Sequence, residues 1–459
     1  MKYFRMLSII CLWVLLLSGC ARDPEPQPTT EPADPQRYLN ILTQAIAAAE
    51  NADDRILNII VSESRQIGSQ NFLTTSTQTL SCQDLTGKPS ICLQEEVSYG
   101  SYHVQSTRSF QNRRASYHVN GQNFHTSMSA DRFLETLIPP VLFDPQQYKE
   151  VTAQHQGENT RLFFRNADRP ESWVVSGQQI QTESASAEAL LRPDGTLAET
   201  VYRTVYQNGS VRITLEVTCQ ITLPQDLDLR GQMPAIPVDS IKLPDLQIPE
   251  LLLRAAADLY AAESIRSSTE EVIDSAAIKT RRTQKIDLLR QGTGPLLDVD
   301  IQYTVELSDY AGNLTGSVTK ESYREGIFTT VTDSNSETSS KLSCDAMETY
   351  CEDLLLMSMF AISHLEDAEL SYADGLCQIR FTGTQDMTQT LCQNIYQLLN
   401  VDLDALDSEH TGEPVSGYLT IDLLTGLPSV AGMALQRTHN INGAAQPLSY
   451  TLHQSYSFT

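Results

Sequence analysis

Nine cysteines are the most reactive side chains in this 459-residue chain. Three close spacings stand out: Cys82 with Cys92, Cys344 with Cys351, and Cys377 with Cys392. Outside the cytoplasm such cysteines oxidise readily, so we interpret these three pairs as possible disulfides. Spacing alone does not fix the pairing. Cys219 lies alone in an alternating segment, where we expect it to be buried.

A metal site is the rival interpretation of the cysteines. Zinc sites use closely spaced Cys and His ligands, and the chain has no C-x-x-C pair and no Cys/His cluster of that spacing. The acidic run at residues 401–409 lacks the glycine and the alternating oxygen ligands of an EF-hand loop, which favours a solvated loop. We therefore predict no metal ligand and no cofactor.

The sequence carries no catalytic motif. His103, His118 and His125 lie in neighbouring alternating segments and could converge on one site. Histidines on a sheet are more often exposed to solvent or hydrogen-bonded to a neighbouring residue than part of a site. No G-x-S-x-G, H-E-x-x-H, Walker-type or G-x-G-x-x-G sequence occurs. Residues far apart in the sequence could still form a catalytic site in the folded protein. An extracytoplasmic hydrolase is therefore the last of three interpretations, after the ligand-binding and scaffold functions described below.

The composition excludes one class of partner and bounds the architecture. The chain has 57 acidic and 32 basic side chains, a net charge of −25. Because phosphate neutralisation needs a basic face, we expect no nucleic-acid partner. A hydrophobic content of 41% can supply a packed core, and at roughly 150 residues per domain the length allows two or three domains.

The amino terminus predicts export. Lys2 and Arg5 precede an apolar run from Met6 to Leu17, and small residues follow before Cys20. The run is too short for a spanning helix and is typical of a secretory signal. Its end, LSGC, resembles the lipobox of bacterial lipoproteins.

The lipobox resemblance implies that residues 1–19 are removed and that Cys20 is lipidated through a thioether. Acyl chains such as palmitate would then anchor the protein to the extracytoplasmic face of the cell membrane, since each buried methylene contributes about 0.8 kcal/mol. The mature chain would carry 30 basic and 57 acidic side chains, a charge of −27, so anionic headgroups would repel it. An ordinary secretory signal or an uncleaved anchor is the alternative.

Two proline-rich stretches divide the rest of the chain. Residues 20–37 contain five prolines and no apolar periodicity, which predicts an extended tether. Residues 224–248 have a similar character and predict a linker. The folded parts should therefore be residues 38–223 and residues 249–459.

These two parts share a pattern. Helix-period segments open them, at residues 39–50 and 251–263. Hairpin signals close them, with turns at Asp194-Gly195 and Asn208-Gly209 in the first part and at Thr425-Gly426 and Asn442-Gly443 in the second. Long period-2 stretches and a short helix, at 131–138 and 351–362, lie between. We also predict an extra helix at 386–399 with Asp386 as its N-cap.

We therefore predict an α+β fold with two tandem repeats. Each would be a curved, half-barrel-like antiparallel sheet with a few packed helices. A chance pair of unrelated β-rich domains is the alternative.

The order of lipobox, short helix, alternating strands, mid-domain helix and closing hairpins resembles the lipoprotein-carrier type of lipoprotein (LolA-like and LppX-like). It also resembles two-domain lipoproteins of Gram-positive bacteria. The resemblance implies a curved sheet that holds helices in its concavity, where several members of the family bind acyl chains.

We expect a non-enzymatic protein that binds an amphiphilic or apolar ligand, with the membrane as a partner through its anchor. Protein partners stay open. The alternative is a cell-envelope interaction or scaffold protein with filled cores, whose acidic faces bind basic partners or cations. A deep apolar cavity would favour the first interpretation and a solid core the second.

Overall fold

The computed structural model of the protein describes residues 30–31, 35–100, 102–137, 145, 148–167, 173–175, 178–180, 182–224, 227–229, 233, 237, 240–276, 279–355, 361–399, 406–441 and 444–458. The predicted signal peptide and Cys20 lie outside these residues, as do most of the tether and much of the predicted linker. Within the described part of the chain, no helix is long and apolar enough to cross a membrane.

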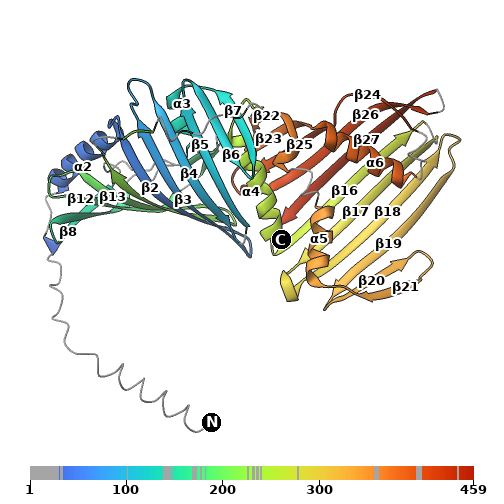
Figure 1. The fold of residues 1–459 in the computed structure, drawn as a ribbon. Coiled ribbons are helices and arrows are strands. Elements are labelled where there is room, and N and C mark those ends of the chain that lie inside the picture. The colour runs from blue at the N-terminus through green and yellow to red at the C-terminus, as the bar shows by residue number, and fades with distance from the viewer. Residues whose placement is uncertain are drawn as a thin grey trace, which may run out of the picture.

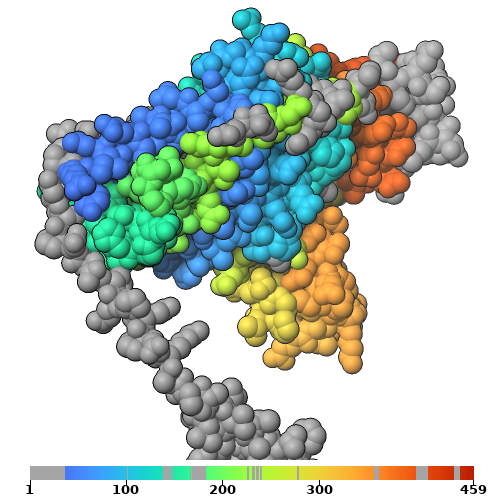
Figure 2. All heavy atoms as spheres, turned by 60° about the vertical axis from the view of Figure 1, so that its left-hand side comes forward, coloured from blue at the N-terminus to red at the C-terminus, as the bar shows by residue number. Residues whose placement is uncertain are grey.

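The first half forms one large antiparallel sheet, coloured blue to green in Figure 1. Helix α2 (Pro35–Glu50) precedes six consecutive strands: β2 (Arg55–Ile67), β3 (Gln70–Gln83), β4 (Ser90–Tyr99), β5 (Tyr102–Gln111), β6 (Arg114–Val119) and β7 (Gln122–Ser127). Helix α3 (Ala130–Thr136) and five strands follow: β8 (Tyr148–Gln156), β9 (Asn159–Ala167), β12 (Thr182–Leu191), β13 (Leu197–Asn208) and β14 (Val211–Thr222). Strand β14 pairs with β2, so blue and green segments far apart in the sequence lie side by side in Figure 2.

Short strands complete this half. At one edge, β1 (Thr30–Glu31) pairs with β8, and at the other, β15 (Ile241–Lys242) pairs in parallel with β7. A separate hairpin consists of β10 (Trp173–Val175) and β11 (Gln178–Ile180).

The second half forms another large antiparallel sheet, coloured yellow to red in Figure 1. Helix α4 (Gln247–Ala261) precedes the strands β16 (Ser264–Ser275), β17 (Thr280–Gln291), β18 (Asp298–Asp309), β19 (Leu314–Arg324), β20 (Ile327–Thr332) and β21 (Glu337–Lys341), with a 3-10 turn η2 (Gly294–Leu296) after β17. Helix α5 (Cys344–Leu354) and the 3-10 turn η4 (Ile362–His364) follow. The remaining elements are β22 (Leu365–Ala373), β23 (Leu376–Gly383), α6 (Gln385–Leu398), β24 (Leu406–Gly412), β25 (Ser416–Asp422), β26 (Pro428–Ile441) and β27 (Ala444–Phe458).

The two sheets run through their strands in the same order. In each, a six-strand meander is followed by a helix and by further strands, of which the last returns to pair with the first: β14 with β2, and β27 with β16. The turn at Asn208-Gly209 joins β13 to β14, and Gly209 has a φ of +59°, a conformation that favours glycine. The predicted turn at Asn442-Gly443 lies outside the described residues.

The expected α+β class is wrong, because the chain is mostly β. The structure has two large antiparallel sheets that are not closed barrels, and it does not have the helix-packed arrangement of an α+β fold. The physical reason lies in the length of the alternating strands, which reach 14 residues in β26 and 15 in β27. We call the face of each sheet that carries the buried side chains its inner face. Strands of this length supply most of the core from their inner faces, so the helices cover only a small part of the sheet surface.

Side-chain caps mark where α5 and α6 begin. Ser343 accepts a hydrogen bond from the Ala346 amide, at 3.3 Å, so α5 begins earlier than the predicted 351–362 helix. Thr384, not Asp386, caps α6 through the Met387 amide, also at 3.3 Å. Asp386 lies in the first turn, where its charge is favourable near the positive end of the helix dipole.

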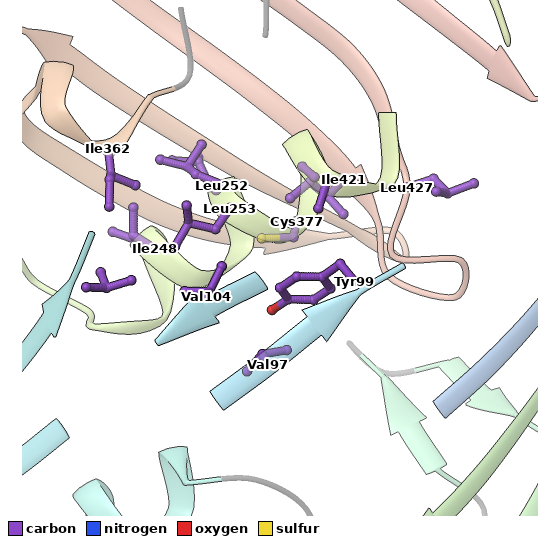
Figure 3. Packing of buried hydrophobic residues seen from close by; sticks show 14 of the residues in the cluster. Val97, Tyr99, Val104, Ile248, Leu252, Leu253, Ile362, Cys377, Ile421 and Leu427 are labelled. Atoms are coloured by element: carbon purple, nitrogen blue, oxygen red, sulfur yellow. The ribbon is translucent and has the colours of Figure 1, made fainter. Parts of the chain in front are cut away.

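Helix α4 joins the two cores. It stands between the sheets in Figure 1, and the buried apolar residues form one cluster that continues through it. Ile248 and Leu252 are 0% exposed. Figure 3 shows the apolar side chains of α4 between Val104 of the first sheet and Ile421 of the second. The first helix of the second half is thus part of the core of both halves.

Candidate functional site

The inner face of the first sheet carries a band of charge within its apolar core. Side chains alternate along a strand, and Glu63 and Arg65 fall in phase with the buried Val61 on β2. Glu95 on β4 and Arg108 on β5 also face inward and are buried. Arg65 and Arg108 are each only 1% exposed, so these charges require partners.

Helix α4 supplies those partners. Glu250, Arg254 and Asp258 are spaced four residues apart and therefore lie in one stripe along the helix, with alternating sign. The Glu250 carboxylate lies 2.5 Å from an Arg108 nitrogen, and Arg254 pairs with Glu63. We call these contacts, together with the pairing of Asp258 with Arg65, the α4 charge ladder.

The Arg65 end of the ladder is the most enclosed. One Arg65 nitrogen donates to both carboxylate oxygens of Asp258, at 2.7 and 2.8 Å. Its guanidinium also lies over the Phe72 ring, 5.5 Å from the centroid. A further Arg65 nitrogen donates to the backbone carbonyl of Thr425, in the turn between β25 and β26. One side chain of the first sheet therefore binds both α4 and the second sheet.

The Arg108 end is supported by neutral groups. Arg108 lies 4.6 Å from the centroid of the Tyr117 ring, a cation–π contact. Glu95 is 3.9 Å from Arg108 and accepts hydrogen bonds from Ser76 and Gln78, at 3.0 and 2.7 Å. Burial raises the pKa of Glu95 although Arg108 opposes that effect.

An apolar hollow of about 480 Å³ lies beside the ladder. Leu252, Leu253, Ala256 and Tyr260 of α4 form one wall, Ile362 and Ser363 of η4 a second, and Tyr102, Asn120 and Gln122 of the first half a third. We call it the α4 pocket. Because its walls come from both halves, its shape depends on how α4 is held.

The three histidines considered from the sequence do not form one site. His103 and His118 line a polar groove on the outer face of the first sheet. Each pairs with a polar neighbour, Ser98 at 2.7 Å and Asn123 at 2.8 Å respectively. His125 instead contacts the Ser240 hydroxyl, at 2.9 Å. Among the described residues, no group of three or more His, Cys, Asp or Glu side chains could hold a metal ion.

The expected disulfides are not formed, since all seven cysteines of the described chain are free thiols. The expected pairs were Cys82 with Cys92, Cys344 with Cys351, and Cys377 with Cys392. Across β3 and β4, Cys82 pairs with Ile91 and Cys92 with Ser81. Because side chains alternate, this register places the first two thiols on opposite faces of the sheet.

The other two pairs lie in the second half of the chain. Cys344 and Cys351 lie seven residues apart on α5, about 10.5 Å along the helix axis, whereas a disulfide needs Cα atoms within about 7 Å. Cys377 lies on β23 facing α4 (Figure 3), and Cys392 lies on α6. Cys219 is fully buried, as expected, and burial raises the pKa of its thiol to about 12.

Sequence reasoning missed the ladder, although two signals point to it. Glu63 and Arg65 occupy inward positions of an alternating strand, where an ionised group must be paired. Glu250, Arg254 and Asp258 share one helix face. The sequence contains both patterns but does not show that they meet.

The comparisons with known proteins add little. No family model and no curated protein matches the chain. LprF from Mycobacterium bovis aligns with 45% of this chain and 98% of its own length, at 9% identity and a TM-score of 0.21. Kievitone hydratase from Nectria haematococca aligns with 87% of this chain and 89% of its own, at 6% identity and a TM-score of 0.12. OccK11 from Pseudomonas aeruginosa aligns with 89% of this chain and 97% of its own length, at 7% identity and a TM-score of 0.11. With identities below 10% and TM-scores of 0.21 or less, these alignments establish neither the fold nor the function of this protein.

The ladder predicts a pH-dependent effect of the substitution Glu63→Gln. Burial raises the pKa of Glu63, but Arg254 and Arg65 outweigh it and hold the pKa below its ordinary value of 4.5. A lowered pKa contributes stability that is present above the unfolded-state value and is lost as the pH falls. We expect Glu63→Gln to cost about 3 kcal/mol of unfolding free energy at pH 7.

Urea unfolding at a series of pH values measures this cost. The difference between the wild type and Glu63→Gln should narrow as the pH falls below 4.5. The control is Glu96→Gln on the exposed outer face of β4, which should change stability by no more than about 0.5 kcal/mol. A Glu63→Gln deficit that is the same at every pH would contradict the ion pairing.

Proposed function

We propose that this protein is a lipid-anchored, extracytoplasmic protein that binds an apolar or amphiphilic ligand in the α4 pocket. The observation that carries the proposal is the lining of the pocket, where Leu252, Leu253 and Ile362 meet at a hollow of about 480 Å³. Ligand pockets are mostly apolar and measure roughly 300–1,000 Å³. Burial of an apolar chain there would stabilise the complex by about 25 cal/mol per Å² of apolar surface.

The rim of the pocket favours an amphiphile over a purely apolar molecule. Tyr102 and Tyr260 are 38% and 39% exposed, so a bound chain would also cover apolar surface of the protein. Asn120, Gln122 and Ser363 line the same pocket and can hydrogen-bond a polar head group. A fatty acid or an acylated lipid satisfies both requirements.

We further propose one shared site, not one site in each half. The first half supplies Tyr102 and Gln122, and the second supplies α4 and η4. The charge ladder holds α4 against the first sheet, so these two walls are positioned before a ligand binds and less ordering is needed on binding.

Binding suits this lining better than catalysis. Glu352 is the one carboxylate among the described lining residues, which include no histidine and no cysteine. General acid–base and nucleophilic chemistry require a positioned pair of reactive groups. We therefore propose a carrier or receptor and not a hydrolase.

The anchor is supported by the sequence. The LSGC motif and the proline-rich stretch after it fit a lipidated Cys20 on an extended tether. In this arrangement the acyl chains attach the protein to the membrane and the folded halves remain free to meet a ligand.

The α4 pocket predicts a binding defect in the variant Ala256→Trp. The indole would occupy the hollow, so the affinity for the fluorescent fatty acid cis-parinaric acid should fall by about ten-fold or more. Fluorescence titration of a chain expressed without residues 1–20 measures this affinity, and native mass spectrometry of the same sample reports any lipid that co-purifies.

The matched control is Ala48→Trp, which places the same side chain on an exposed position of α2. It should bind the probe as the wild type does. Wild-type protein that neither co-purifies with lipid nor binds the probe would exclude the ligand-binding proposal and favour a scaffold role.

The anchor predicts that an alkyne analogue of palmitate labels the protein in growing cells. Cys20→Ser should abolish the label because the acceptor thiol is lost, while Cys11→Ser should leave it unchanged because residue 11 lies in the discarded signal. In-gel fluorescence after click chemistry measures the label. Persistent labelling of Cys20→Ser would overturn the assignment of the anchor.

A further inference from the structure

The outer face of the second sheet carries a groove of about 690 Å³ that runs across the strands, from β22 to β16. In the sheet order, β23, β25, β26 and β27 lie between these two strands. Five strand spacings of about 4.8 Å give it a length of about 24 Å. We call it the transverse groove.

One row of the groove consists of residues paired in register from strand to strand. The row runs Glu369, Arg380, Tyr418, Gly432, His453, Glu270. Every side chain in it can donate or accept hydrogen bonds, and all but Gly432 line the groove. The sheet register alone therefore aligns reactive polar groups along the whole length of the groove.

The adjacent row is made of small residues. It runs Asp367, Thr382, Ser416, Ala434, Thr451, Val272. All six line the groove. Because their side chains are short, they leave a depression beside the larger polar row, with hydroxyl groups on its floor.

Gly432 fixes the central aromatic ring. A Cβ atom at this position would lie 2.5 Å from Cε1 of Tyr418 and 2.6 Å from Cζ, far inside contact distance. The ring of Tyr418 therefore lies against the backbone of β26, which only glycine allows. Its hydroxyl crosses β26 to reach Nδ1 of His453, at 2.8 Å. This contact holds a flat aromatic surface at the centre of the groove.

The chemistry of the groove excludes several kinds of occupant. Glu270, Asp367 and Glu369 outnumber Arg380, so an anion such as a phosphate polymer would be repelled. A purely apolar chain would leave the carboxylates desolvated without partners. A peptide strand binds by pairing with a sheet edge, and here it would cross strands whose backbone groups already pair with one another.

A neutral oligosaccharide meets each requirement. Its hydroxyls can donate to the carboxylates and accept from Arg380 and from the floor hydroxyls, and its ring faces can pack on Tyr418. We propose that the transverse groove is a binding site for an extended neutral glycan, separate from the α4 pocket. If the protein is lipid-anchored as proposed above, such a site would hold its folded halves, including the α4 pocket, against a polysaccharide layer.

The experiment uses the full chain in lipid nanodiscs, with chitohexaose and cellohexaose as probes in isothermal titration calorimetry. We expect saturable binding of at least one of the two. Thr451→Trp fills the floor of the groove and should weaken binding by about ten-fold or more. Thr75→Trp, at an exposed outer-face position of β3, is the matched control and should stay within about two-fold of the wild type.

Two outcomes would overturn the proposal: no saturable binding of either oligosaccharide, or equal binding by Thr451→Trp and the wild type. Circular dichroism of both tryptophan variants establishes that each is folded. Binding of cis-parinaric acid should be unchanged in Thr451→Trp, so failure of the groove and failure of the α4 pocket are distinguishable.

Discussion

Six charged side chains pair where α4 lies against the first sheet, and three of them, Arg65, Arg108 and Asp258, are almost completely buried. Charges removed from water are costly unless each finds an opposite charge and hydrogen bonds in good geometry. Asp258 accepts two hydrogen bonds from Arg65, and Arg254 forms an ion pair with Glu63. Such an interface contributes more to the specific placement of α4 than to the free energy of unfolding. Any other placement of the helix would leave buried charges unpaired.

This specificity explains why the two halves form one body and where a ligand would bind. The apolar core continues through α4 from one sheet to the other, and Arg65 also reaches the carbonyl of Thr425 in the second half. These contacts position the α4 wall of the α4 pocket relative to the first sheet. The transverse groove depends on a different feature, the register of the strands of the second sheet, and would persist without the ladder.

Much of the local structure follows from the sequence, and most of the tertiary structure does not. The alternating segments, the Asn208-Gly209 turn and the opening helices can be read from periodicity and turn chemistry. The fold class could not be predicted in this way. Alternation does not show over what length neighbouring strands pair, or how small a part of the sheet surface the helices cover. Register also separates Cys82 from Cys92, which are close in the sequence but lie on opposite faces of the sheet. The inward positions of Glu63 and Arg65 are visible in advance, whereas their partners on α4, about 190 residues later, depend on how whole sheets pack.

A double-mutant cycle at Arg65 and Asp258 tests the central claim, that paired buried charges fix α4 to the first sheet. The unfolding free energies of Arg65→Met, Asp258→Leu and the double variant are compared with that of the wild type. We expect each single substitution to cost about 3–5 kcal/mol and the double variant to cost clearly less than their sum, with a coupling of at least about 1.5 kcal/mol. Costs that add to within about 0.5 kcal/mol would contradict the claim.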